Sequence, residues 1–222
     1  MFHRDEHGIY HVPAFDVLGW IEHGFGSRHA TLWRDDPRVV ALHQIHSAIC
    51  LVADGRPGRI GEGDALVTAV PGALLTVRTA DCIPALLADE RRHVVAAVHA
   101  GWRGTLQDVV GAAIRSMRER FCSRPEDLLT AIGPGIGACC YEVGPEVAVQ
   151  FKELFPERDD LDGTTKLDLV EANRRRLLAA GVPSARISVA GLCTYCRPEE
   201  FHSYRRDRAG AGRMASAIGI RP

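Results

Sequence analysis

Residues 79–104, TADCIPALLADERRHVVAAVHAGWRG, contain two apolar runs joined by a charged turn. We predict that the two runs pair as an antiparallel hairpin that turns about Glu90 and Arg91, because both are short and rich in aliphatic residues. In that register Cys82 lies opposite His99. Directly opposed residues have Cβ atoms about 4.5–5.5 Å apart, so the thiol and the imidazole could share one metal ion or one proton.

Outward from this hairpin, short β-like runs alternate with a few helical runs. Further strands are predicted at 48–52, 65–68, 73–77, 187–192 and 214–220. Apolar residues at helical spacing predict helices over 105–121, 145–155 and 168–181. Consecutive strands followed by helices indicate an α+β fold, and we predict a single domain over residues 1–222.

The composition indicates a globular protein, because 46% of the 222 residues are hydrophobic. A formal net charge of −1 offers no electrostatic footprint for a nucleic-acid backbone, and no apolar run is long enough to span a membrane. The N-terminal stretch MFHRDEHGIYHV lacks the basic start and apolar centre of a secretory signal, so a cytoplasmic protein is predicted. A small-molecule ligand, such as an anion, is therefore expected rather than a polymer or a membrane.

The cysteines point to metal binding or catalysis rather than to a disulfide framework. The chain has seven of them, an odd number, and Cys139 and Cys140 are adjacent. Cys193 and Cys196 form one CxxC motif. Because the adjacent pair is a poor second half for a zinc ribbon, structural burial at a strand end is predicted for this motif.

Candidate catalytic residues flank Cys82 and His99. Taken singly, these two residues are better explained as a buried thiol and a histidine that bonds a carbonyl. However, Asp81 places a carboxylate beside the thiol, and Arg103 follows the histidine at a predicted helix start that suits anions. In HQIHSA, His46 is predicted to point inward. His46, Cys82 and His99 would form a set that suits Zn²⁺ or Cu²⁺ and leaves a fourth position open.

Six stretches from His43 onward resemble, in order, the signature blocks of the YfiH type laccase-domain family (multicopper polyphenol oxidoreductases): HQIHS, GDALVT, TADCIPALLAD, AAVHAGWRGT, AIGPGIGACCYEVGPEV and CTYCRPEEFHSYRRDRAGAGRMASAI. The resemblance implies a four-layer α/β/β/α domain with mixed β-sheets, in which His46, Cys82 and His99 hold one metal ion. It also implies phosphorolysis of adenosine, inosine and methylthioadenosine, with adenosine deamination as a further activity. The region before His43 is shorter than the family pattern, which has a Gly-rich loop and a helix after the arginine that corresponds to Arg28.

Phosphorolysis requires phosphate held against the anomeric carbon and a proton for the departing base. Arg103, with Arg28 or Arg205, could hold phosphate through bidentate hydrogen bonds. Asp81 is the candidate acid, or the carboxylate that supports a metal ligand. The other predicted substrate-binding residues are Gln44, Tyr141 and Arg206.

Three other functions stay open. Copper-dependent polyphenol oxidation ranks lower, because it ordinarily uses several coppers and many histidines. A metal-free cysteine hydrolase could use Cys82 activated by His99 and oriented by Asp81, and a non-enzymatic domain could use a metal for stability alone. The residues leave the native metal, the physiological substrate and the oligomeric state open.

The remaining N-terminal histidines are predicted to be solvated surface residues: His3, His7, His11, His23 and His29.

Overall fold

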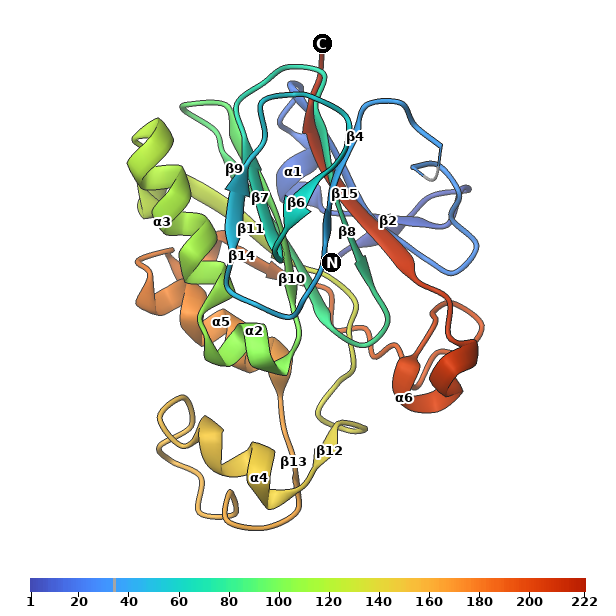
Figure 1. Ribbon diagram of the computed structural model, residues 1–222, viewed down its shortest axis with the longest axis vertical. Coiled ribbons are helices and arrows are strands. Elements are labelled where there is room, and N and C mark those ends of the chain that lie inside the picture. The colour runs from blue at the N-terminus through green and yellow to red at the C-terminus, as the bar shows by residue number, and fades with distance from the viewer. Residues whose placement is uncertain (34) are drawn as a thin grey trace.

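The computed structural model describes residues 1–33 and 35–222, and it packs two β-sheets face to face with helices over one of them (Figure 1). Within these residues the larger sheet has seven strands, in the order β1-β2-β3-β15-β8-β4-β6. Their bounds are β1 His3–Arg4, β2 Ile9–His11, β3 Ile21–Gly26, β4 Val39–His43, β6 Gly58–Glu62, β8 Leu74–Thr79 and β15 Met214–Ile220.

The second sheet has six strands among the described residues, in the order β14-β11-β9-β10-β7-β5. Their bounds are β5 Cys50–Val52, β7 Ala65–Thr68, β9 Ile83–Asp89, β10 Val94–Ala100, β11 Leu128–Ile132 and β14 Ile187–Val189. A short ribbon pairs β12 (Glu142–Val143) with β13 (Thr165–Lys166). Parallel and antiparallel pairs occur in both large sheets, which confirms the mixed α+β prediction.

The predicted hairpin exists as β9 and β10, but its register differs from the prediction by two residues. His99 pairs with Pro84 and not with Cys82. The predicted direct opposition of Cys82 and His99 was therefore wrong. A shift of two residues keeps a side chain on the same face of a strand, so Cys82 still lies on the His99 side, just before β9 begins.

The turn explains this register. Asp89 is fully buried and accepts the backbone N–H groups of Arg91 at 2.9 Å and Arg92 at 3.1 Å. His93 adopts a left-handed backbone with φ of 51°. Because Asp89 pairs with Val94, the turn is centred one residue later than predicted.

Helices cover the outer face of the second sheet, with bounds α2 Trp102–Leu106, α3 Val109–Phe121 and α5 Leu169–Ala179. The single helix predicted over 105–121 is interrupted, because Asp108 has a left-handed backbone with φ of 62°. Its carboxylate caps α3 by accepting the Gly111 N–H at 3.1 Å. The predicted apolar face of α3 is confirmed, since Val110, Ala113 and Met117 are fully buried.

The shorter helices are α1 Pro13–Asp16, α4 Pro145–Ala148 and α6 Tyr204–Asp207. The helix predicted over 145–155 is therefore α4 followed by a 3₁₀ turn, Val149–Phe151. Strand β11 and the N-terminal strands were not predicted, whereas β15 has the predicted bounds.

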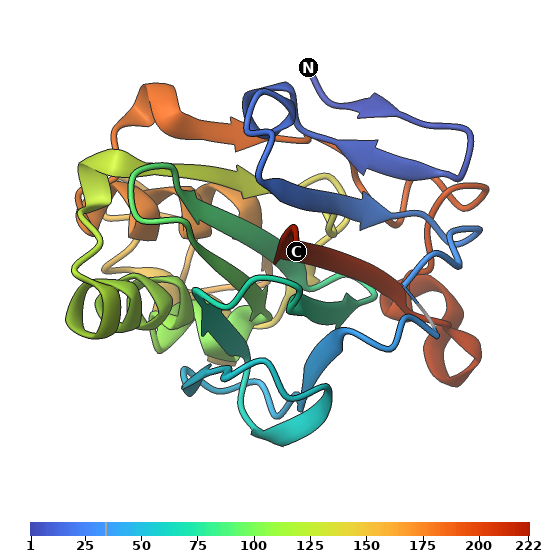
Figure 2. The ribbon, with the colours of Figure 1, turned by 90° about the horizontal axis from the view of Figure 1, so that it is seen from above.

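The core has two main layers, one between the sheets and one beneath the helices. Figure 2 shows α3 on the opposite side of the paired sheets from the blue N-terminal strands. On the outer face of the larger sheet, Trp33 packs with Ile9, Leu74 and Ala217. No helix in the described part of the chain is both long and apolar enough to cross a membrane.

Candidate active site

His46, Cys82 and His99 come together beside the end of β10. One ligand atom from each lies within 4.8 Å of the others. Cys82 Sγ is 3.9 Å from His46 Nε2, and the two imidazole rings meet edge to face with centroids 4.9 Å apart. His46 comes from the turn after β4, where its φ of 61° is left-handed. The structure thus brings together three residues that are far apart in the chain.

Gly101, directly after β10, allows this close approach. A Cβ added at Gly101 would lie 2.9 Å from His46 Cδ2 and 3.1 Å from Cys82 Sγ. The glycine of the HAGW stretch therefore leaves the space that the imidazole and the sulfur occupy.

The fully buried Asp64 holds this cluster in place, although it was not among the predicted site residues. Its carboxylate lies 2.8 Å from His99 Nδ1 and accepts the backbone N–H groups of His46 at 3.0 Å and Ser47 at 2.6 Å. This contact occupies Nδ1 and leaves Nε2 of His99 available. Asp64 lies in the GDALVT stretch immediately before β7, and β7 pairs with β10. Its position immediately before a strand that pairs with the His99 strand is the signal that could have identified Asp64.

Asp64, Cys82 and His99 each favour the charged form of their neighbour in the cluster. Burial raises the pKa of Asp64, but hydrogen bonds from His99 and Ser47 outweigh it, and the net pKa is lowered to about 2. Burial likewise raises the pKa of Cys82, yet hydrogen bonds and positive charge from His46 and His99 lower it to about 6. Burial lowers the pKa of His99, whereas Asp64 and Cys82 raise it to about 9. The metal-free cluster therefore favours a thiolate beside an imidazolium.

This donor set fits a Zn²⁺ or Cu²⁺ ion. His46 Nε2, Cys82 Sγ and His99 Nε2 would supply two imidazole nitrogens and one thiolate, the three protein ligands typical of an open zinc site. The Asp64 contact to His99 is the carboxylate support that metal-bound histidines usually have. These residues could therefore hold a metal that keeps one position free for a ligand.

The cluster faces a cavity of about 970 Å³ with an unusually cationic wall. Within residues 1–33 and 35–222, none of the arginines that line it forms a salt bridge with a carboxylate. They are Arg59, Arg78, Arg103, Arg205, Arg208 and Arg213. A chain of net charge −1 thus concentrates unpaired positive charge in one place. Such a wall suits an anionic ligand.

The model of the multi-copper polyphenol oxidoreductase laccase family matches residues 27–221. The chain belongs to this family. Membership confirms the resemblance to YfiH type laccase domains seen in the sequence.

Relatives within the family have names that refer to purine nucleosides. A purine nucleoside phosphorylase of Deinococcus radiodurans is 44% identical over 84% of this chain and 79% of its own length. Adenosine deaminase RL5, from an unknown prokaryotic organism, is 38% identical over 70% of this chain and 61% of its own length. The crystal structure of YlmD from Geobacillus stearothermophilus is 30% identical, matches 100% of this chain and 99% of its own, and has a TM-score of 0.89.

Five of the predicted residues outside the cluster of His46, Cys82 and His99 line the cavity. Arg103 stacks on Trp102, with its guanidinium carbon 4.3 Å from a ring centroid. Arg205 lies 5.3 Å from the ring centroid of the buried Tyr141. Gln44 bonds the backbone oxygen and nitrogen of Arg78, each at 2.8 Å. Its amide therefore braces one side of the cavity.

Asp81 is the fifth of these residues, and its carboxylate already accepts two hydrogen bonds. It accepts hydrogen bonds from Thr194 Oγ1 at 2.7 Å and from the Arg205 backbone N–H at 2.6 Å. Its φ of 83° turns the chain into β9. Asp81 therefore ties the wall segment that carries Arg205 to the segment that carries Cys82.

The structure does not bring Arg28 and Arg206 into the cavity. Arg206 donates to the carbonyl oxygens of Thr194 and Tyr195, each at 3.0 Å. Arg28 donates its backbone N–H to the carbonyl oxygen of Glu200 at 2.8 Å. Both arginines support the chain segment that leads to α6.

One spare histidine departs from the surface prediction. His23 is only 6% exposed, and its Nε2 accepts the Val12 N–H at 2.9 Å. Burial, with repulsion from neighbouring positive groups, lowers the pKa of His23 to about 3. It lies within reach of His11 and Asp16, but its hydrogen bond to the backbone gives it a structural role. The surface prediction was wrong for this residue because β3 is covered by α1 and its flanking residues.

Proposed function

We propose that this chain is a metal-dependent purine nucleoside phosphorylase acting on adenosine, inosine and methylthioadenosine, with adenosine deamination as a second activity. In phosphorolysis a phosphate oxygen bonds to the anomeric carbon, the bond from that carbon to the purine nitrogen breaks, and the base takes up a proton. The cavity carries the proposal, because unpaired arginines surround the His46, Cys82 and His99 cluster. The names of the family relatives agree with this chemistry.

Arg103 is the proposed phosphate ligand closest in sequence to the cluster. Its guanidinium lines the cavity and stacks on Trp102, which restricts its orientation without using its N–H donors. A guanidinium held in this way can donate two parallel hydrogen bonds to a phosphate. Arg205 and the other cavity arginines would balance the remaining negative charge.

His46, Cys82 and His99 would hold the metal, which when bound supplies a Lewis acid that polarises an oxygen or activates water. Asp64 keeps Nδ1 of His99 engaged, so that Nε2 is the nitrogen left for a metal. Burial and the nearby Cys82 charge raise the pKa of Tyr141 to about 12, so that its phenol can donate a hydrogen bond toward the purine. The phenol therefore stays protonated at neutral pH.

The test is base release by purified, zinc-supplemented full-length protein. Inosine, adenosine and methylthioadenosine are incubated with and without phosphate, and the products are separated by liquid chromatography. We expect free hypoxanthine or adenine only when phosphate is present, and inosine from adenosine if deamination occurs. No base from any of the three nucleosides would show that the phosphorylase proposal is wrong.

Two observations favour alternatives that the same protein preparation can test. The family description favours copper-dependent phenol oxidation, which predicts oxygen consumption with a phenol and copper-loaded protein. The contacts of Asp64 with His99 and of Cys82 with its histidines favour a cysteine hydrolase, with Asp64 and not Asp81 as the orienting group. A metal ion that binds to the wild type and is lost in Cys82→Ala would count against that metal-free hydrolase.

The non-enzymatic alternative predicts a different response to chelation. If the metal at His46, Cys82 and His99 only stabilised a binding domain, its removal should unfold the chain. A catalytic metal should instead be removable with loss of turnover while the far-ultraviolet circular dichroism is retained.

A further inference from the structure

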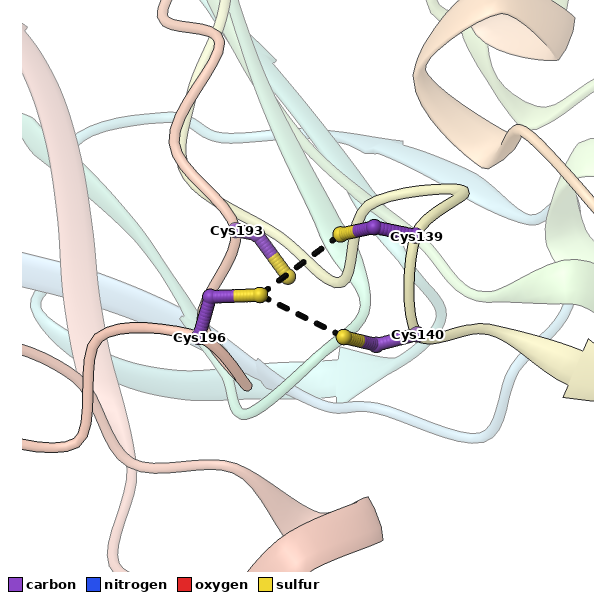
Figure 3. Close-up of side chains that lie close together, drawn as sticks. All are labelled: Cys139, Cys140, Cys193 and Cys196. Carbon is purple, nitrogen blue, oxygen red and sulfur yellow. Dashed lines mark hydrogen bonds between the residues drawn. The ribbon is translucent and has the colours of Figure 1, made fainter.

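Four cysteines outside the candidate active site converge on one point. Cys139 and Cys140 lie in the loop between β11 and β12, and Cys193 and Cys196 lie in the loop after β14. Their sulfur atoms all lie within 4.8 Å of one another. Figure 3 shows the two pairs facing each other, with the side chains directed into the gap between the loops. The CxxC motif therefore has a partner pair that the sequence spacing did not reveal.

We propose that Cys139, Cys140, Cys193 and Cys196 form a structural zinc site, separate from the candidate active site. Zinc sites of this kind hold four thiolates at about 2.3 Å in a tetrahedron, which places neighbouring sulfurs about 3.8 Å apart. Cys196 Sγ is 3.6 Å from Cys139 Sγ and 3.3 Å from Cys140 Sγ. These separations are somewhat shorter than the tetrahedral edge, so small side-chain movements would admit the ion. Four thiolates would complete the coordination without a position for water or substrate.

The pattern of contacts is that of a shared central ion rather than of two disulfides. A disulfide joins sulfurs in pairs about 2.05 Å apart. Here the Cys196 sulfur has two close neighbours at similar distances, and all four cysteines are free. Because Cys139 and Cys196 are also exposed, burial does not explain their convergence. The predicted structural burial of the CxxC motif was therefore wrong for Cys196.

The backbone around the cluster is shaped for thiolate ligands. The Gly137 N–H donates to Cys193 Sγ at 3.2 Å, and such N–H donors stabilise negative charge on sulfur. A Cβ added at Gly137 would lie 3.3 Å from Cys139 Sγ and 3.3 Å from Cys193 Cβ. The glycine thus lets the first loop approach the second closely enough for four sulfurs to meet.

A zinc ion here would join two segments that also build the active-site wall. Outside the cysteines, the loops are connected by a backbone bridge in which the Thr194 N–H donates to Gly135 O at 3.0 Å. Cys140 is followed by Tyr141, and Thr194 bonds Asp81. The site would hold these residues in position whatever reaction the cavity catalyses, so this inference does not depend on the proposed function.

Elemental analysis of zinc-supplemented full-length protein tests the site. We expect about two zinc ions per chain in the wild type, one in Cys196→Ser, one in Cys82→Ala and none in the double variant. Cys122→Ser is the matched control, because Cys122 is a free, exposed cysteine outside both clusters, and it should retain both ions. Unchanged zinc content in Cys196→Ser relative to the wild type would overturn the proposal.

X-ray absorption on Cys82→Ala keeps the test decisive even if Cys196→Ser does not fold. In that variant the remaining zinc should show about four sulfur neighbours near 2.3 Å. A shell containing nitrogen, an absence of zinc, or fewer than six titratable thiols in the denatured, chelator-treated variant would each contradict a four-thiolate site.

Discussion

The two cysteine-containing clusters of this molecule differ in donors, burial and surroundings. At the candidate active site, one thiolate and two imidazoles face a cavity lined with arginines, and the buried Asp64 supports one of the imidazoles. The other cluster has four thiols between two surface loops and no carboxylate contact of this kind in the described residues. Three ligands beside a cavity leave a position for substrate, whereas four ligands close the coordination. Under the two proposals, the cluster beside the cavity takes part in the reaction and the four-cysteine cluster stabilises the fold.

Replacing Cys82 should give the largest effect and should affect activity more than stability. In Cys82→Ala we expect kcat/KM for phosphorolysis to fall roughly 10³-fold, because a metal contributes several kcal/mol to transition-state stabilisation. Steady-state assays and thermal denaturation measured on the same preparation check this. Cys122→Ser should match the wild type in both. If Cys82→Ala retained activity, the open cluster would not be the catalytic one.

Replacing Cys196 should affect stability more than activity. Losing a structural zinc ligand should lower the free energy of unfolding by about 3 kcal/mol, which corresponds to a decrease in Tm of roughly 6–12 °C for a chain of this length. Scanning fluorimetry of Cys196→Ser and Cys122→Ser, with and without a chelator, measures it. A chelator should lower the Tm of the wild type toward that of Cys196→Ser. Equal Tm values for the two serine variants would remove the distinction between the clusters.

The sequence predicts the elements of this fold better than the contacts between them. Hydrophobic periodicity identified the buried face of α3 and the bounds of β15, because buried side chains recur at the period of the helix or strand that carries them. The register of β9 and β10 depends instead on the Asp89 carboxylate, which caps the turn. The spacing of apolar residues does not predict these hydrogen bonds in the turn.

The candidate site shows the same limit. His46, Cys82 and His99 were singled out because their residue types and flanking residues suggest a metal, whereas Asp64 lies in the GDALVT block with no other candidate ligand beside it. Its role appears only when β7 pairs with β10. The four-cysteine cluster is likewise created by two loops that come together in the tertiary structure.

Neutralising Asp64 tests whether the carboxylate support belongs to the open cluster. In Asp64→Asn we expect the metal affinity of the active site to fall 10- to 100-fold, roughly the cost of losing such support. The measurement is activity as a function of free zinc concentration. Asp54→Asn is the control, because Asp54 is exposed and, among the described residues, its carboxylate has hydrogen bonds and a salt bridge only with Arg56. The four-cysteine zinc should remain bound in both variants, and equal zinc dependence of the two variants would contradict the proposed role of Asp64.

Arg103 provides the smallest and most specific test, because the cavity that it lines is also lined by His46, Cys82 and His99. In Arg103→Ala we expect the KM for phosphate to rise about tenfold, since a charge-assisted bidentate contact contributes roughly 1.5 kcal/mol or more. Arg103→Lys should fall between the wild type and alanine, because an ammonium keeps the charge but loses the paired N–H geometry. Arg120→Ala, on the exposed end of α3, is the matched control. A rise in the KM for the nucleoside with no change in that for phosphate would instead assign Arg103 to the purine or ribose side of the cavity.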